Sequence, residues 1–122
     1  MRRDFTYIDD IVEGLVRVHD RPAFGNSAWS GDDPDPASST APYRIYNIGN
    51  HSPTDLLEMI AILERSLGKK AVMNMLPMQA GDILSTFADV EHLSNDVGFE
   101  PATSLEVGLT NFVRWYREYH NA

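Results

Sequence analysis

The sequence contains no cysteine and no long apolar run, and its start is not that of a secreted protein. Without cysteine there is no disulfide framework, no thiolate nucleophile and no cysteine-based zinc site, a pattern that favours a reducing compartment. No apolar stretch approaches the roughly 20 residues of a membrane-spanning helix, and the basic first residues run into acids where a signal peptide needs an apolar core. We therefore expect a cytoplasmic protein that does not enter a membrane.

Basic residues are scarce relative to acidic ones. Ten Lys and Arg stand against eighteen Asp and Glu, which gives a formal net charge of −8 over 122 residues. A surface with this bias repels polyanions and anionic lipid headgroups at long range, so neither nucleic acid nor a membrane is an expected partner. Hydrophobic residues make up 43% of the chain, as in an ordinary folded domain.

Motifs for catalysis and metal binding are also missing. The sequence has no glycine-rich dinucleotide loop, no Walker-type phosphate loop and no Gly-x-Ser-x-Gly elbow. The four histidines lack ligand spacing, and the acids of residues 32–35 lack the glycine and terminal Glu of a calcium loop. Asp9 and Asp10 point about 100° apart on a helix, so favourable charge at its N-terminus explains them better than paired catalysis. We assign no metal and no catalytic residue.

The hydrophobic pattern predicts an alternation of strands and helices. The expected elements are strand 4–7, helix 8–19, strand 43–48, helix 53–67, strand 71–76, and two helices capped by Asp89 and Ser104. Thr6 is expected to cap the first helix and Ser52 the second. This order predicts one α/β domain with a small, partly parallel sheet and packed helices.

Residues 21–42 are expected to form a long loop, because they are rich in proline, glycine and aspartate and show no periodicity. A loop of this length is normally a lid, a binding loop or a disordered segment. Phe24 and Trp29 are large apolar groups, which favours a loop that packs down in part. We expect its centre, residues 32–36, to be mobile.

Five segments together carry a family resemblance: 3–10 (Arg-Asp-Phe-Thr-Tyr-Ile-Asp-Asp), 46–49, 77–82, 88–89 and 105–116. In this order they resemble the carboxyl-terminal part of the extended short-chain dehydrogenase/reductase family, closest to UDP-glucuronate 4-epimerases and related nucleotide-sugar epimerases. The resemblance covers nearly the whole chain except the loop 21–42. It implies the carboxyl-terminal part of an NAD(P)-binding Rossmann-type fold: one substrate-binding domain over 1–122, without the amino-terminal cofactor domain.

In that family the amino-terminal part supplies the NAD loop, and a Tyr-x-x-x-Lys pair removes the 4-hydroxyl proton during hydride transfer to NAD. No tyrosine here is followed four residues later by lysine. The resemblance thus implies the UDP-sugar-binding portion of an NAD-dependent 4-epimerase, an isomerase, that holds no cofactor itself and is inactive alone. The alternative is a non-catalytic interaction module, and a homodimer is expected. A complete small enzyme using Asp9, Asp10 or Asp82 is disfavoured, because no second polar group is placed to assist them.

The resemblance implies four UDP-binding residues. Arg3 faces the diphosphate, which suits its guanidinium, although composition alone is equally consistent with a solvated charge. Asp82 matches the acid of an Arg-x-Gly-Asp loop near the ribose, and Gln79 stands where many relatives have a second phosphate-binding arginine. Asn47 matches an asparagine near the diphosphate, and closing a strand explains it equally well. For Tyr7, packing beneath the first helix is the expected role.

Overall fold

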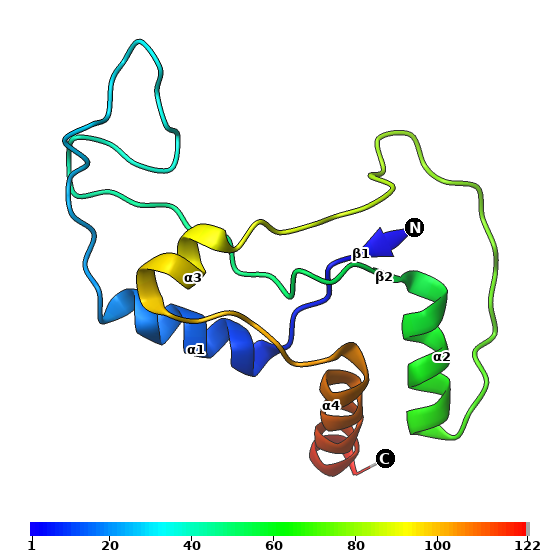
Figure 1. The fold of residues 1–122 in the computed structure, drawn as a ribbon. Coiled ribbons are helices and arrows are strands. Elements are labelled where there is room, and N and C mark those ends of the chain that lie inside the picture. Colours follow the sequence, from blue (N-terminus) through cyan, green and yellow to red (C-terminus); the bar gives the residue numbers. More distant parts are fainter. Residues whose placement is uncertain (122) are drawn as a thin grey trace.

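The structure, a computed structural model, describes residues 1–121, which form four helices and a very small sheet (Figure 1). In chain order the elements are β1 (Arg2–Arg3), α1 (Ile8–His19), β2 (Thr54–Asp55), α2 (Leu56–Leu67), α3 (Glu91–Val97) and α4 (Leu105–His120). None of these helices is long and apolar enough to cross a bilayer in the part of the chain described. The expected α/β organisation is present, with long irregular segments between its elements.

The sheet is built around β1. On one side β1 pairs antiparallel with β2, in the register that puts Arg2 opposite Asp55. On the other side Arg2 forms a parallel bridge with Ser85, in which the Arg2 N–H donates to the Leu84 carbonyl at 2.9 Å and the Thr86 N–H donates to the Arg2 carbonyl at 3.3 Å. The prediction of a small sheet with some parallel pairing is confirmed.

Three expected strands do not form in residues 1–121. Residues 4–7 lie beyond the end of β1 and form no strand; residues 43–48 contribute only an isolated bridge between Arg44 and Ser38; and residues 71–76 carry no strand. A strand exists only beside a neighbour that satisfies its backbone N–H and C=O groups. These three segments have the composition of strands, but in residues 1–121 no neighbouring strand lies beside them to form a ladder.

α4 begins at its predicted cap and α3 ends at its predicted glycine, but Val90 and not Asp89 is the N-cap of α3, which has no side-chain cap. The Ser104 side chain accepts a hydrogen bond from the Val107 N–H at 3.3 Å and caps α4. Asp89 Oδ1 accepts from the Glu91 N–H at 3.0 Å, next to the start of α3. That helix ends at Gly98, whose φ of 64° lies in the left-handed region that glycine adopts most easily.

Two other helix starts differ from the prediction. α1 has Tyr7 at its N-cap and no side-chain cap, so Thr6 does not cap it. α2 begins at Leu56 and not at Pro53, because residues 54–55 are drawn into pairing with β1. Ser52 therefore does not cap α2, and its N–H instead donates to the Asp4 carboxylate at 3.2 Å.

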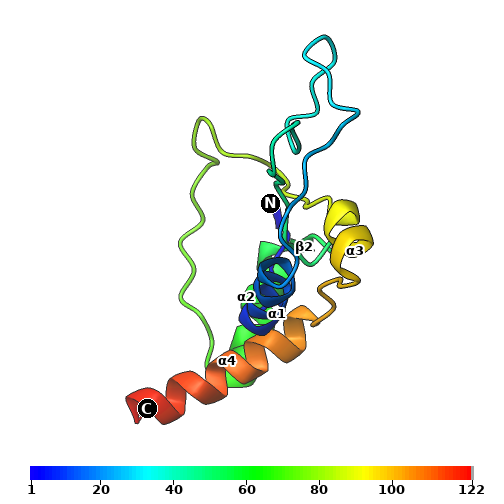
Figure 2. The ribbon, with the colours of Figure 1, turned by 90° about the vertical axis from the view of Figure 1, so that its left-hand side faces the viewer.

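The core is small. It lies where α2 packs against α4 and where α1 packs against α3. Its buried apolar side chains are Ile62, Val90, Leu93 and Val113. The partner of Tyr7 differs from the expected first helix: Tyr7 packs against α4, since a Cβ at Gly108 would come within 3.1 Å of the Tyr7 ring. Figure 2 shows the C-terminal part of α4 extending beyond the other helices and the segment after α2 running alone along one side. Much apolar surface therefore remains uncovered.

The loop 21–42 projects beyond α1 and α3 (Figure 1), yet its middle is folded around Asp35. The Asp35 carboxylate accepts hydrogen bonds from the Ala37 N–H at 2.8 Å and the Ser38 hydroxyl at 2.6 Å. The Trp29 indole N–H donates to the Asp35 carbonyl at 3.1 Å, whereas Phe24 stays 82% exposed. Trp29 is thus bound within the loop itself and Phe24 is exposed, and packing of the loop on the rest of the chain and mobility of its centre stay predictions.

Candidate functional site

Arg3 lies at the junction of two segments that are far apart in the sequence. Side chains of consecutive strand residues point to opposite faces, so Arg2 and Arg3 reach in different directions. The Arg2 guanidinium donates to the Pro53 carbonyl at 2.7 Å, and Arg3 Nη1 donates to the Ile83 carbonyl at 2.7 Å. Arg3 is half-buried and adjoins the loop that carries Asp82.

Gln79 and Asp82 belong to one tight turn. The Asp82 N–H donates to the Gln79 carbonyl at 3.2 Å, and Gly81 between them has a φ of 93° that favours glycine. Both side chains are exposed. Since Ile83 follows directly and is bonded to Arg3, the structure brings Arg3, Gln79 and Asp82 into one neighbourhood.

Asn47 is held elsewhere. Its Nδ2 donates to the Asp89 carbonyl at 3.2 Å, just before α3. This contact gives Asn47 a structural role, one of the two alternatives that the sequence left open. It ties Asn47 to the segment before α3 instead of to Arg3.

Asp4 is a residue that sequence reasoning missed. Its Oδ2 accepts hydrogen bonds from the His51 and Ala88 N–H groups, both at 3.1 Å, and its Oδ1 accepts from the Ser52 N–H at 3.2 Å. The Asp4 N–H itself donates to the Thr86 hydroxyl at 3.0 Å. The signal was an acid directly after Arg3, inside the most distinctive segment, 3–10.

The backbone around Asp4 is closely packed. A Cβ at Gly49 would overlap the Ala88 side chain and come within 3.0 Å of Asp4 Oδ2, so only glycine fits there. His51 has a φ of 55°, which is uncommon for a residue other than glycine, and its ring lies edge-on to Phe87 at 4.5 Å between centroids. We call Asp4, Gly49, His51, Thr86 and Ala88 the Asp4 junction.

A second polar cluster, outside the predicted site, ties the base of the long loop to α3. Arg44 Nη2 lies 2.9 Å from His92 Nδ1, and the Tyr46 hydroxyl donates to Asp96 Oδ2 at 2.8 Å. Partial burial, followed by the Asp96 hydrogen bond, raises the pKa of Tyr46. The hydrogen bond from Ser38 and that from the Ala37 N–H lower the pKa of Asp35. Arg44 and Tyr46 are thereby held against α3.

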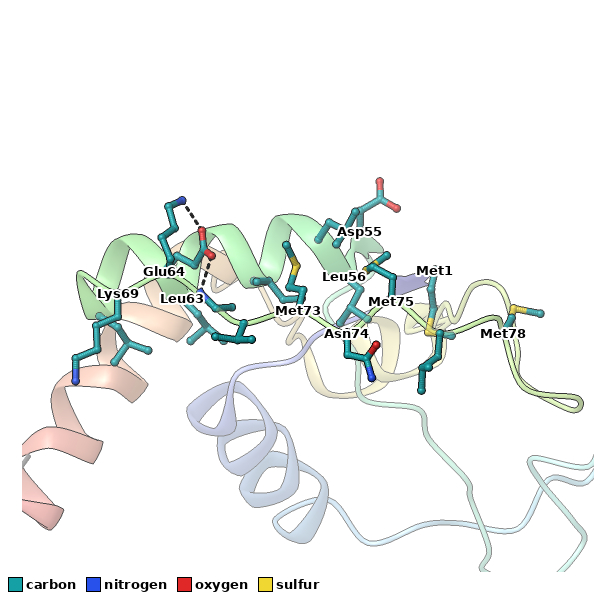
Figure 3. Close-up of a pocket in the computed structure, with 17 residues that line it drawn as sticks. Met1, Asp55, Leu56, Leu63, Glu64, Lys69, Met73, Asn74, Met75 and Met78 are labelled. Atoms are coloured by element: carbon teal, nitrogen blue, oxygen red, sulfur yellow. Dashed lines mark hydrogen bonds and ion pairs between the residues drawn. The ribbon is translucent and has the colours of Figure 1, made fainter.

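An apolar groove of about 820 Å³ separates α2 from residues 69–78 (Figure 3). Glu64 closes one end, because its carboxylate accepts from Lys70 Nζ at 2.6 Å and from the Ala71 N–H at 2.8 Å. The Lys70 bond lowers the pKa of Glu64. Most other lining groups are apolar: Met1, Leu56, Leu57, Ile60, Leu63, Leu67, Val72, Met73, Met75, Leu76 and Met78. This apolar groove suits apolar side chains and not a diphosphate.

Metal ligands do not gather in the part of the chain described. No group of three or more His, Cys, Asp or Glu among these residues is arranged to hold an ion.

Curated relatives match almost the whole chain, but only part of themselves. Protein CapI of Staphylococcus aureus is 50% identical over 120 residues, covering 98% of this chain and 36% of that protein. UDP-glucuronate 4-epimerase 1 of Arabidopsis thaliana is 44% identical over 121 residues, covering 98% and 27%. The chain thus spans roughly a third of the length of the curated relatives it matches. No protein-family model matches it.

Solved structures give the same result. UDP-glucuronic acid 4-epimerase from Bacillus cereus, in complex with NAD, superimposes with a TM-score of 0.66 at 26% identity, over 96% of this chain and 30% of that one. The chain matches a carboxyl-terminal fragment of an extended short-chain dehydrogenase/reductase epimerase. UDP-glucose 4-epimerase from Bifidobacterium longum, in complex with NAD+ and UDP, superimposes with a TM-score of 0.71 over 97% of this chain and 30% of that one. At 20% identity this similarity supports the fold alone. The family resemblance and the fold class expected from the sequence are confirmed.

Proposed function

We propose that residues 1–122 act as the UDP-sugar-binding domain of an NAD-dependent UDP-sugar 4-epimerase. The observation that carries this proposal is the hydrogen bond from Arg3 to the Ile83 carbonyl, which brings a guanidinium beside the turn with Gln79 and Asp82. The similarity to UDP-glucuronate 4-epimerases supports the choice of ligand. The proposal includes a cytoplasmic location, for which the lack of cysteine is the support.

Each residue has a chemical task in this proposal. Within residues 1–121 both hydrogen bonds that the Arg3 guanidinium donates come from Nη1, to the Arg2 and Ile83 carbonyls, so Nε and Nη2 are left for diphosphate oxygens. The exposed Asp82 carboxylate accepts from ribose hydroxyls, and the Gln79 amide offers a neutral donor. Asn47 would contribute the Oδ1 of an amide whose Nδ2 is bound to Asp89. Because the net charge is −8, binding of an anion depends on the local cation at Arg3.

The chain by itself is proposed to bind no NAD and to catalyse no epimerisation. It contains neither a glycine-rich dinucleotide loop nor a Tyr-x-x-x-Lys pair, so the hydride acceptor and the proton-transferring groups must come from outside residues 1–122. Turnover of UDP-glucuronate by the purified chain, followed by chromatography of the sugar nucleotides, would contradict this part of the proposal.

Calorimetric titration with UDP tests the binding function. We expect saturable binding that Arg3→Ala weakens by about tenfold, the loss of one charge-assisted interaction. Arg2→Ala is the matched control. It removes the same charge from the neighbouring residue, whose guanidinium binds the Pro53 carbonyl. Absence of binding by the wild-type chain, or equal losses in both variants, would refute the assignment.

A second function is favoured by the apolar groove: association with another protein chain, here a homodimer. Val72 is fully exposed, and Met75 and Leu76 are each 73% exposed. Apolar surface of this kind marks sites that another chain covers. Sedimentation equilibrium would find a dimer whose stability is indifferent to UDP if association is the chain's principal function, and a monomer at high micromolar concentration would exclude it.

A further inference from the structure

Asp4 connects three segments that do not follow one another in the sequence. It directly follows β1, and its carboxylate accepts from His51 and Ser52 in the turn before β2 and from Ala88 beyond the parallel bridge. Three backbone N–H groups on one carboxylate use most of its acceptor capacity. Asp4 therefore holds the turn 49–52 and the segment 86–88 against the end of β1.

The same contacts determine where Arg3 meets the turn of Gln79 and Asp82. The parallel pairing of β1 with residues 84–86 is only a single bridge, at Arg2 and Ser85. Directly beyond it, the Asp4 N–H binds the Thr86 hydroxyl and the Asp4 carboxylate binds the Ala88 N–H. These two contacts extend a short pairing and keep the Ile83 carbonyl opposite Arg3.

We propose that Asp4 is a positioning residue for UDP recognition, which sets the register of β1 against residues 83–88 and thereby presents Arg3 and Asp82 to the nucleotide together. The inference rests on the UDP-binding function proposed above. It assigns Asp4 no contact with the ligand: Asp4 acts through the backbone that carries Arg3 and through the segment that follows Asp82.

The carboxylate is required because an amide cannot accept at both ends. In Asp4→Asn one end becomes an NH₂ donor that faces a backbone N–H, so at least one of the three hydrogen bonds is lost. The substitution also removes a negative charge beside Arg3. An effect of charge alone would tighten the binding of an anionic nucleotide, whereas loss of position weakens it, so the two explanations predict opposite signs.

Calorimetric UDP titration of Asp4→Asn tests the inference. We expect the dissociation constant to rise about fivefold to tenfold, as for the loss of one hydrogen bond to a charged group. Asp10→Asn is the matched control. Asp10 is also half-buried and its carboxylate also accepts from a backbone N–H, that of Thr103 at 2.9 Å, and in addition from the Thr103 hydroxyl at 2.9 Å, but it anchors the start of α4. It should lower the melting temperature and leave the UDP affinity unchanged.

Two further variants separate positioning from general destabilisation. Thr86→Val removes the hydroxyl that accepts from the Asp4 N–H at nearly constant volume, and it should weaken UDP binding in the same direction. In an Arg3→Ala background Asp4→Asn should cost less affinity than it does in the wild-type chain, because only the position of Asp82 then still matters, and it should still lower the melting temperature.

The outcomes distinguish this inference from the function on which it rests. Failure of the wild-type chain to bind UDP overturns the proposed function and the inference with it. Binding that Arg3→Ala weakens but Asp4→Asn leaves unchanged or tightens overturns the inference and retains the function. Additive losses for Asp4→Asn and Arg3→Ala would show that Asp4 does not act through Arg3.

Discussion

Irregular segments of the chain are held by hydrogen bonds at the Asp4 junction, whereas beside the apolar groove they are left uncovered. At the junction, backbone N–H groups of residues 51, 52 and 88 end on one carboxylate, and glycine lets two segments touch. Beside the groove, residues 71–76 form no helix or strand and are exposed, with apolar side chains that face solvent. A segment whose polar groups find partners within the chain is held in place, whereas one rich in uncovered apolar side chains needs a partner to cover them.

The largest expected effect comes from forcing the junction apart. Gly49→Ala introduces a Cβ that overlaps Ala88 and crowds the Asp4 carboxylate, so we expect a loss of about 2 kcal/mol in the free energy of unfolding. Urea denaturation followed by far-UV circular dichroism measures it. Gly31→Ala is the control, because a Cβ there meets nothing within 4 Å. Equal stability of the two variants would mean that the close approach at Gly49 is relieved at no cost.

The next largest effect concerns the expected dimer, in which a second chain covers the apolar groove. Val72→Asp places a carboxylate on a fully exposed side of the groove and should leave the fold of a single chain intact while raising the dissociation constant of the expected dimer by about tenfold. Sedimentation equilibrium over a concentration series measures this change. Val107→Asp, at a half-exposed position of α4 outside the groove, is the matched variant and should leave association unchanged. Equal weakening by both would assign the interface to another face.

Amide hydrogen exchange should show the contrast directly. The N–H groups of Arg2, Thr86 and Ala88 are hydrogen-bonded at the junction and should exchange slowly, as should those within α2. Residues 72–76 and the loop centre 32–36 should exchange close to the rate of an unfolded peptide, and limited proteolysis should cut the loop first. Slow exchange over 32–36 would show that the contacts of Asp35 hold the whole loop.

The smallest effect is on pH dependence. The Ser38 hydrogen bond lowers the pKa of Asp35 in the folded chain, so its contribution to stability is complete above the unfolded-state value of about 4 and is lost as the pH falls below that value. Ser38→Ala should shift the titration of the Asp35 carboxyl upward, observed by carbon NMR. Ser39→Ala is the control, because the Ser39 hydroxyl bonds Ala41. An unchanged Asp35 titration in Ser38→Ala would assign the shift to another group.

Local signals predicted the helices well and their first residues less well. Ser104 and Gly98 act where the sequence indicated, because a cap and a left-handed stop depend only on neighbouring backbone groups. Ser52 was a plausible cap for α2, but its N–H is bound by Asp4, 48 residues away, and the next residues pair with β1. Long-range pairing overrode a correct local preference.

The candidate site shows the same division. Arg3, Gln79 and Asp82 could be named from the resemblance, and the turn at Gly81 from its composition. Their proximity depends on the bridge between Arg2 and Ser85, which no local pattern encodes. Asn47 was named with them, yet the folded chain ties its side chain to Asp89.

The sequence by itself determined the charge, the helices, the family resemblance and the types of residue available to an anionic ligand, since all of these depend on composition, short spacings or ordered motifs. The tertiary structure decided which segments pair, that Asp4 joins three of them, and that the face beside residues 71–76 stays open. The physical reason is that a backbone N–H or an apolar side chain is satisfied only by groups that folding brings to it, and these groups lie tens of residues away.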